Sequence, residues 1–125
     1  MIADAIARTN TLRTAQGQSR IQSDAKLNRA ALKHACDLAS SGTFSHTGTD
    51  GSSVGDRVRG AAYSWSYVAE NIAWGQNSAD AVVSSWAGSA AHRRNMLSSR
   101  AEEIGIASVP SDRGPIWVMV LAAGQ

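Results

Sequence analysis

The chain has 125 residues, a length typical of one domain of roughly 100–200 residues. With 43% hydrophobic and 18% charged residues it is too apolar for a disordered protein, and a formal net charge of +2 excludes a strongly basic nucleic-acid-binding tail. Its longest apolar run, residues 116–123, is shorter than the roughly 20 residues of a membrane-spanning helix. We therefore expect a single domain over residues 1–125, with no transmembrane segment and no nucleic acid as a partner.

Residues 1–20 do not have the apolar core of a secretory signal peptide, because Asp4, Arg8, Arg13 and Arg20 interrupt every apolar run. On this segment alone, we expect either a cytoplasmic protein or a mature fragment from which a leader has been removed.

Helical periodicity predicts two helices in the first third of the chain. The first covers residues 2–15 and ends before Gly17. The second begins after Asp24 as N-cap and runs to Ser41, with Gly42 just past its end. Its stripe is rich in alanine, so we expect another layer to pack closely against it.

Two residues inside the second helix have side chains of a reactive or metal-binding type. Cys36 is the only cysteine, so an internal disulfide is excluded, and its alanine-rich surroundings predict a small buried side chain. His34 lies beside the apolar stripe and is interpreted as a hydrogen-bonded histidine in the core or half-buried at its edge.

The middle of the chain alternates loop, helix and strand. Residues 43–52 have the composition of a loop. Ser53 and Asp56 have the spacing of a capping box, which predicts a short helix ending near Gly60. Residues 65–72 alternate in a pattern typical of a strand.

The last third predicts one more helix and a hairpin. Ser78 caps a helix that turns Trp86 inward, and residues 89–100 form an irregular polar segment. Residues 104–109 and 116–122 are two β-rich runs joined by a longer hairpin loop. These elements predict an α+β domain in which helices pack on a small antiparallel sheet.

Three side chains stand out as candidates for a functional site. His46 lies in a loop rich in Gly, Ser and Thr, two residues after the aromatic Phe44. Glu70 is the only charged residue of residues 64–77, so a buried position would require a cation or donors to keep it ionised. His92 lies at a helix end or tight turn.

Spacing leaves the joint role of these three residues open. His46, Glu70 and His92 are 24 and 22 residues apart, which matches no local metal-binding signature. Two imidazoles and a carboxylate could hold zinc, or could form a hydrogen-bonded polar cluster. A Ser-His-Glu arrangement with Ser45 or Ser89 has no G-x-S-x-G segment to support it.

Charged and aromatic side chains elsewhere have simpler interpretations. Alternating aromatic residues such as Trp65 and Tyr67 are typical of a packed sheet face. A solvated or salt-bridged surface is the expected role of five arginines: Arg57, Arg59, Arg93, Arg94 and Arg100.

Five segments in this order and spacing resemble the bacterial branch of the CAP superfamily, the cysteine-rich secretory, antigen 5 and pathogenesis-related 1 proteins, also called the SCP domain. They are residues 10–13 (NTLR), 27–39, 44–46 (FSH), 70–75 (ENIAWG) and the W-x-x-S-x-x-H-R-x-N-M-L pattern of 86–97. The closing Ile104-Gly105-Ile106 and Trp117 also fit.

The resemblance implies an α-β-α sandwich around a central antiparallel sheet, and a cleft lined by two histidines and two acidic residues. By motif, His46, Glu70 and His92 supply three of these four, and Ser89 stands where the second glutamate would be. The resemblance also implies that Asn71 and Trp74 shape the cleft, and that Arg93 and Asn95 brace the turn holding His92.

The resemblance implies a protein that is secreted or located in the cell envelope, and the expected function is that of a monomeric binding module for a small ligand, which could be hydrophobic, a lipid or a divalent metal. His46 and His92 could hold that metal, Zn²⁺ or another divalent ion. Two alternatives remain open: a metal- or base-assisted hydrolase using Glu70 with His46 and His92, and a structural or interaction protein without ligand chemistry. Membership of a fold family does not choose between them.

Overall fold

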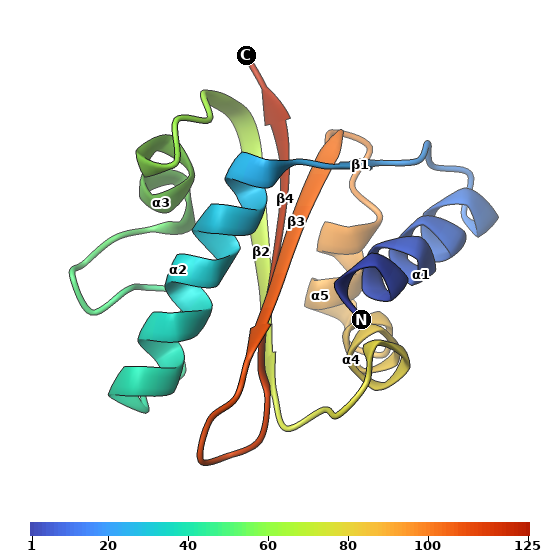
Figure 1. Cartoon of the computed structure of the whole chain (residues 1–125). Coiled ribbons are helices and arrows are strands. Elements are labelled where there is room, and N and C mark those ends of the chain that lie inside the picture. Colours follow the sequence, from blue (N-terminus) through green and yellow to red (C-terminus); the bar gives the residue numbers. More distant parts are fainter.

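The computed structural model describes residues 1–125 as a four-stranded sheet between two layers of helices, confirming the predicted α-β-α sandwich (Figure 1). The strand order is β1-β3-β4-β2. The elements in chain order are α1 (Ile2–Ala15), β1 (Gln22–Ser23), α2 (Ala25–Ser41), α3 (Val54–Gly60), β2 (Trp65–Trp74), α4 (Ala79–Ala87), α5 (Ala90–Met96), β3 (Glu103–Val109) and β4 (Ile116–Gly124).

Strand β4 lies at the centre of the molecule and is buried on both faces. Successive side chains of a strand point to opposite faces, so an apolar run without polar interruptions suits a strand covered on both sides. Trp117, Met119 and Leu121 pack against α1, α4 and α5. Val118, Val120 and Ala122 pack against α2 and α3. The sheet therefore separates two hydrophobic cores.

The predicted helix ends are confirmed where a capping side chain defines them. The Asp24 carboxylate accepts hydrogen bonds from the backbone N–H groups of Lys26 and Leu27 at the start of α2. Gly42 ends the same helix in a left-handed conformation with φ of 72°. Ser53 and Asp56 form the expected reciprocal capping box at the start of α3.

Three local expectations are corrected by the structure. The segment expected to be irregular contains α5, whose only buried residue is Met96, so the apolar stripe that would have revealed a helix is missing. The two exposed residues of β1 pair in parallel with β3, so the sheet is not purely antiparallel. Cys36 is exposed, because it lies on the solvent side of α2 and not on its alanine stripe.

Helix α2 lies unusually close to β3, as its alanine stripe predicted. A Cβ atom built on Gly105 would lie 2.3 Å from the Leu27 carbonyl carbon and 2.4 Å from the Asn28 nitrogen. The Asn28 side-chain oxygen also accepts a hydrogen bond from the Ile106 N–H, 3.1 Å away. Helix and strand backbones therefore touch at Gly105.

A buried arginine joins α1 to the end of α5. The side chain of Arg13 is fully buried, and its hydrogen-bond acceptors are backbone carbonyl oxygens and not a carboxylate. It donates hydrogen bonds to the carbonyls of Ser19, Met96 and Ser98 at 2.8–2.9 Å. These contacts fix the C-terminal end of the helix that carries His92.

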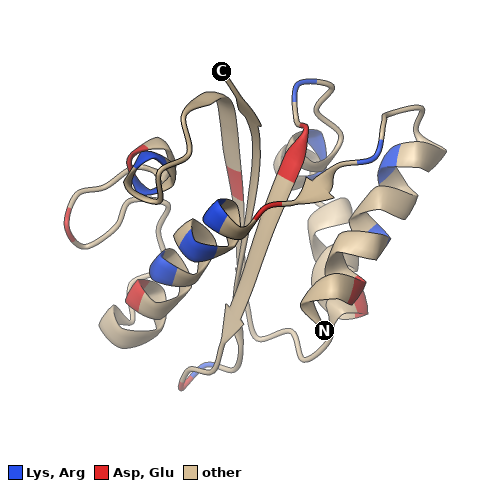
Figure 2. Cartoon of the chain, turned by 45° about the horizontal axis from the view of Figure 1, so that its top comes forward, with Lys and Arg blue, Asp and Glu red and all other residues tan.

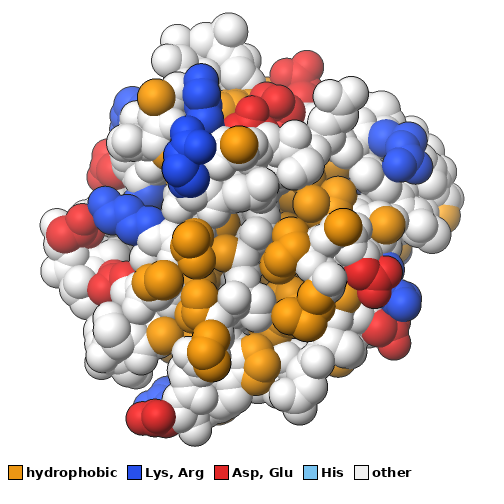
Figure 3. Space-filling view, in the orientation of Figure 1, with side chains coloured by type: hydrophobic (Ala, Val, Ile, Leu, Met, Phe, Trp, Pro, Cys, Tyr) orange, Lys and Arg blue, Asp and Glu red, His pale blue; other side chains and the backbone are white.

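The surface combines charged and apolar regions. Lys and Arg residues recur along α2 (Figure 2). On the face seen in Figure 1, hydrophobic side chains gather in the centre, over the region between α1 and α2 (Figure 3). No helix combines the length and the apolar character needed to span a bilayer.

Candidate functional site

Glu70 occupies a buried position in the middle of β2, facing the layer formed by α2 and α3. It is the only acidic residue of that strand (Figure 2), and 1% of its side chain is exposed. Arg57 of α3, equally buried, donates from Nη2 to Glu70 Oε2 at 2.8 Å. His46 Nδ1 lies 2.9 Å from Oε1. Each carboxylate oxygen therefore has a donor of its own.

Arg57 also fixes the loop that carries His46. Its Nη1 donates to the Ser52 carbonyl at 2.9 Å, and its Nη2 donates to the His46 carbonyl at 3.0 Å. The capping box at the start of α3 orients the helix turn from which Arg57 projects. One guanidinium thus joins β2, α3 and the loop of residues 43–52.

His46 is the exposed member of this group. Since an ionised carboxylate can only accept, His46 Nδ1 donates to Glu70 and Nε2 is left for other partners. The hydrogen bond that His46 donates to Glu70 raises the pKa of His46 above its ordinary value of 6.5, against the opposing effects of partial burial and of Arg57. With 58% of its side chain exposed, His46 presents the far side of its ring to solvent.

His34 of α2 adds a second histidine to the same carboxylate. As predicted, it is a buried core histidine, and its Nε2 donates to the Ser45 carbonyl at 2.7 Å. The same nitrogen lies 3.8 Å from Glu70 Oε1. Burial lowers the pKa of His34, outweighing the opposite effect of Glu70. Burial therefore disfavours the charged form of His34, and its hydrogen bond to the Ser45 carbonyl supports the backbone of the loop that carries His46.

Arg57 and His34 are the members of the group that the sequence did not assign to it. Arg57 was expected on a salt-bridged surface, and His34 was expected only in the core or at its edge. The sequence feature that could have pointed to such partners is Glu70 itself. An isolated carboxylate in an apolar strand is stable when buried only beside a charged or hydrogen-bonding partner.

Asn71 lies on the opposite face of β2, because neighbouring residues of a strand alternate. Its side-chain nitrogen donates to the His92 carbonyl at 3.1 Å, and its side-chain oxygen accepts from Asn95 at 2.9 Å. Asn71 and Asn95 therefore hold α5 against the sheet. Arg93 reaches the Ala87 carbonyl only at 3.5 Å, which makes it the weaker brace.

His92 approaches the group from this second layer. Partial burial lowers the pKa of His92, and the nearby charge of His46 lowers it further. Its ring forms no hydrogen bond to Glu70 or to His46. The structure therefore joins His46 and Glu70 directly and leaves His92 as a separate neighbour.

The remaining two candidates lie at the ends of neighbouring elements. Ser89 is the N-cap residue of α5, but its hydroxyl makes no capping hydrogen bond. Trp74, at the end of β2, is 45% exposed and meets the Phe44 ring edge-to-face, with 6.2 Å between ring centroids.

The cleft expected between His46, Glu70 and His92 stays a prediction. None of the cavities in the structure is lined by any of the three residues. Arg57 and the His46 loop cover Glu70 from one side of the sheet, while His92 belongs to the other.

The donor set does not fit a three-residue zinc site. No three His, Cys, Asp or Glu residues are arranged to hold a metal ion. Both oxygens of Glu70 already accept hydrogen bonds. Zinc binding by His46 and His92 alone stays a prediction.

The raised pKa of His46 predicts a pH-dependent contribution to stability. The contact with Glu70 favours the protonated ring, so its stabilisation is fully present below the unfolded pKa and is lost as pH rises through the folded pKa. Unfolding in urea at about pH 5 and about pH 8.5 should therefore show a larger loss for His46→Gln at the lower pH. An equal loss at both pH values would contradict this.

Comparisons with known proteins support the family resemblance. A model of the cysteine-rich secretory protein family, CAP, matches residues 6–121. The chain is 33% identical over 109 residues to the uncharacterized protein YkwD of Bacillus subtilis (strain 168), a match that covers 87% of this chain and 42% of YkwD. The chain thus spans less than half the length of that relative.

Two solved structures have the same fold. An outer surface protein from Borrelia burgdorferi has a TM-score of 0.88 at 21% identity, covering 96% of this chain and 90% of that one. An extracellular SCP-domain protein from Bacillus anthracis str. Ames has a TM-score of 0.90 at 21% identity, covering 97% of this chain and 39% of that one.

Proposed function

Because the chain belongs to the cysteine-rich secretory protein (CAP) family, we propose that it works outside the cell as a binding domain, with His46 as the polar group that meets the ligand. The extracellular location is inferred from its structural neighbours, which include an outer surface protein and an extracellular protein.

The observation that carries this proposal is the state of Glu70. A general base must lie within hydrogen-bond reach of the proton that it removes, so the reacting group must have access to it. Both Glu70 oxygens face donors, at 2.8 and 2.9 Å, and 1% of the side chain is exposed. Glu70 is therefore suited to orient the His46 ring and to favour its protonated form, and it is poorly suited to activate water.

His46 has the properties of a recognition group. Glu70 fixes its Nδ1, so the ring is held in one orientation, and Arg57 fixes its backbone carbonyl. Nε2, which makes no hydrogen bond within the protein, can donate one when the ring is protonated and accept one when it is neutral. A polar ligand group or a metal ion can use this nitrogen without displacing any contact within the protein.

The proposal is tested by identifying what the protein carries when it is purified. Metals, lipids and small molecules bound to the wild type, His46→Ala and Thr47→Ala are extracted and quantified by mass spectrometry. Thr47 is the matched control, since it is an exposed neighbour in the same loop. At least one species should be depleted about tenfold in His46→Ala alone, as expected for loss of a hydrogen bond to a charged group. Identical contents in all three proteins would contradict the proposal.

Two further measurements separate the alternatives. Calorimetric titration with Zn²⁺ should give binding heat with the wild type and none with the His46→Ala, His92→Ala double variant, and equal heats would remove the zinc prediction. On peptide, ester and lipid substrates, we expect wild type and Glu70→Gln to be equally inactive. Turnover that Glu70→Gln abolishes would favour the hydrolase.

A further inference from the structure

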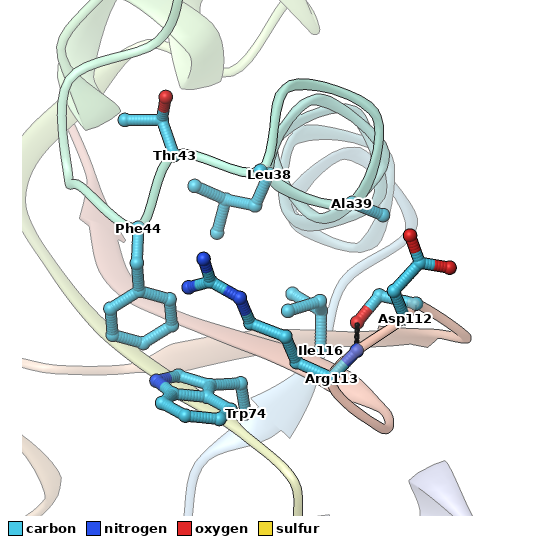
Figure 4. Close-up of a pocket in the computed structure, with 10 residues that line it drawn as sticks. Leu38, Ala39, Thr43, Phe44, Trp74, Asp112, Arg113 and Ile116 are labelled. Carbon is cyan, nitrogen blue, oxygen red and sulfur yellow. Dashed lines mark hydrogen bonds between the residues drawn. The ribbon is translucent and has the colours of Figure 1, made fainter.

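A second candidate site lies at the end of the sheet where β2 stops and the β3–β4 hairpin turns. It is a cavity of about 170 Å³ between the C-terminal end of α2, Phe44, Trp74 and the hairpin loop (Figure 4). His46, Glu70 and His92 are not among its lining residues. An inference about this cavity therefore does not rest on the proposed function.

Half of the residues that line the cavity are aliphatic or aromatic. Leu38, Ala39 and Ile116 form its aliphatic side. Phe44 and Trp74 form its aromatic side and remain 41% and 45% exposed, although most large apolar side chains of this chain are covered. Their rings meet at an interplanar angle of 71°, the edge-to-face arrangement that leaves aromatic surface free for another ring.

Arg113 and Trp74, two exposed residues that line this cavity, each have a side-chain donor that makes no hydrogen bond within the protein. Arg113 takes part in none of the ion pairs, and its only hydrogen bond is donated by its backbone N–H to Ser111 Oγ. Figure 4 shows its side chain crossing the cavity beside Phe44, and its guanidinium carbon lies 5.7 Å from the centroid of the Trp74 ring.

The second donor is the indole N–H of Trp74. The other three tryptophans all donate to backbone carbonyls: Trp65 to Gly55, Trp86 to Ile72 and Trp117 to Gln76. Trp74 alone has no such bond. A cavity with an aliphatic and aromatic side, beside a guanidinium that makes no hydrogen bond or ion pair, is complementary to an anion attached to an apolar group.

We propose that this cavity binds a small carboxylate carried by a single aromatic ring, with the carboxylate on Arg113 and the ring against Phe44 and Trp74. The cavity is smaller than the roughly 300–1,000 Å³ of sites for drug-sized ligands, so one ring with a short chain fits and a whole lipid does not. Asp112 also lines the cavity, and its carboxylate lies on the side away from the Arg113 guanidinium, near Ala39 (Figure 4). Asp112 thereby disfavours the reversed orientation of the ligand.

The test is a titration of ¹⁵N-labelled protein with 3-phenylpropionate, followed through the indole N–H resonances. The Trp74 resonance is assigned by its loss in Trp74→Phe. The chemical shift of this resonance should change and reach saturation with a dissociation constant of about 1 mM. The indole resonances of the buried Trp86 and Trp117 should not shift. Uncharged 3-phenylpropanamide should bind about tenfold more weakly, because it cannot pair with the guanidinium.

A matched pair of arginine variants locates the carboxylate. Arg113→Gln should weaken binding about tenfold. Arg59→Gln should leave it unchanged, although Arg59 also lies over a tryptophan, 5.1 Å from the centroid of the Trp65 ring. Unshifted Trp86 and Trp117 resonances show that each variant is folded. Absence of a saturable Trp74 shift, equal binding of the amide, or equal binding by Arg113→Gln would each overturn the proposal.

Discussion

Replacing Arg57 with methionine is expected to lower the free energy of unfolding by about 3–5 kcal/mol at neutral pH, the usual cost of leaving one partner of a buried ion pair alone. The substitution leaves the buried Glu70 with His46 as its only close donor. It also removes the hydrogen bonds to the carbonyls of Ser52 and His46. Urea unfolding measures the change.

Arg59 provides the control for this variant. It lies two residues later in the same helix and pairs with Asp56 at 3.2 Å, but more than half of its side chain is exposed. Exposed ion pairs contribute about 0–1 kcal/mol, so Arg59→Met should change stability by no more than that. Adding Glu70→Gln to Arg57→Met should recover part of the loss, because no unpaired charge then remains. Equal effects of Arg57→Met and Arg59→Met would contradict the buried-pair interpretation.

Replacing Gly105 with alanine is expected to cost at least about 3 kcal/mol, near the upper end of what overpacking produces. The added Cβ would lie 2.3–2.6 Å from backbone atoms of Leu27 and Asn28. Backbone atoms cannot turn aside as a flexible side chain can, so α2 must shift away from β3. That shift would also strain the hydrogen bond between Asn28 and Ile106.

Gly60→Ala is the matched control for the glycine prediction. Gly60 ends α3, and a Cβ built on it meets nothing within 4 Å. Alanine is the better helix former by up to about 1 kcal/mol, so this variant should be neutral or slightly more stable. Thermal or urea unfolding compares the two substitutions directly. A Gly105→Ala protein as stable as Gly60→Ala would show that helix and strand are not in backbone contact.

The elements that could be predicted from the sequence are those whose limits are encoded locally. The Asp24 cap, the left-handed Gly42 and the capping box of Ser53 and Asp56 act within a few residues, and the structure confirms all of them. Helix α5 has no such signal: Ser89 makes no capping bond, and only Met96 is buried. The position of α5 depends instead on Asn71 and Arg13, which are distant in sequence.

The candidate site shows the same division between local and long-range information. His46 and Glu70 could be selected because each is unusual in its own segment, and the structure brings their side chains into contact. The partnership of Glu70 with Arg57 arises only when α3 packs beside β2. The separation of Glu70 from His92 follows from strand alternation, since Asn71, which holds the α5 backbone, necessarily faces the other layer.

The contacts of Glu70 also bear on the proposed function. Under the proposed function, a carboxylate that already accepts from an arginine and a histidine would act on a ligand only through His46. The proposed binding chemistry would then be concentrated on the imidazole of His46, whose side chain is 58% exposed and whose pKa Glu70 raises.

The most direct test of this account is the pKa of His46, measured by NMR titration of its ring in the wild type and in Glu70→Gln. Because the Glu70 carboxylate raises the pKa of His46, the wild-type value should lie above the ordinary 6.5. In Glu70→Gln that value should fall to or below 6.5, since partial burial and Arg57 both lower it. A wild-type pKa at or below 6.5, or one that Glu70→Gln leaves unchanged, would show that Glu70 does not control His46 and would contradict the account.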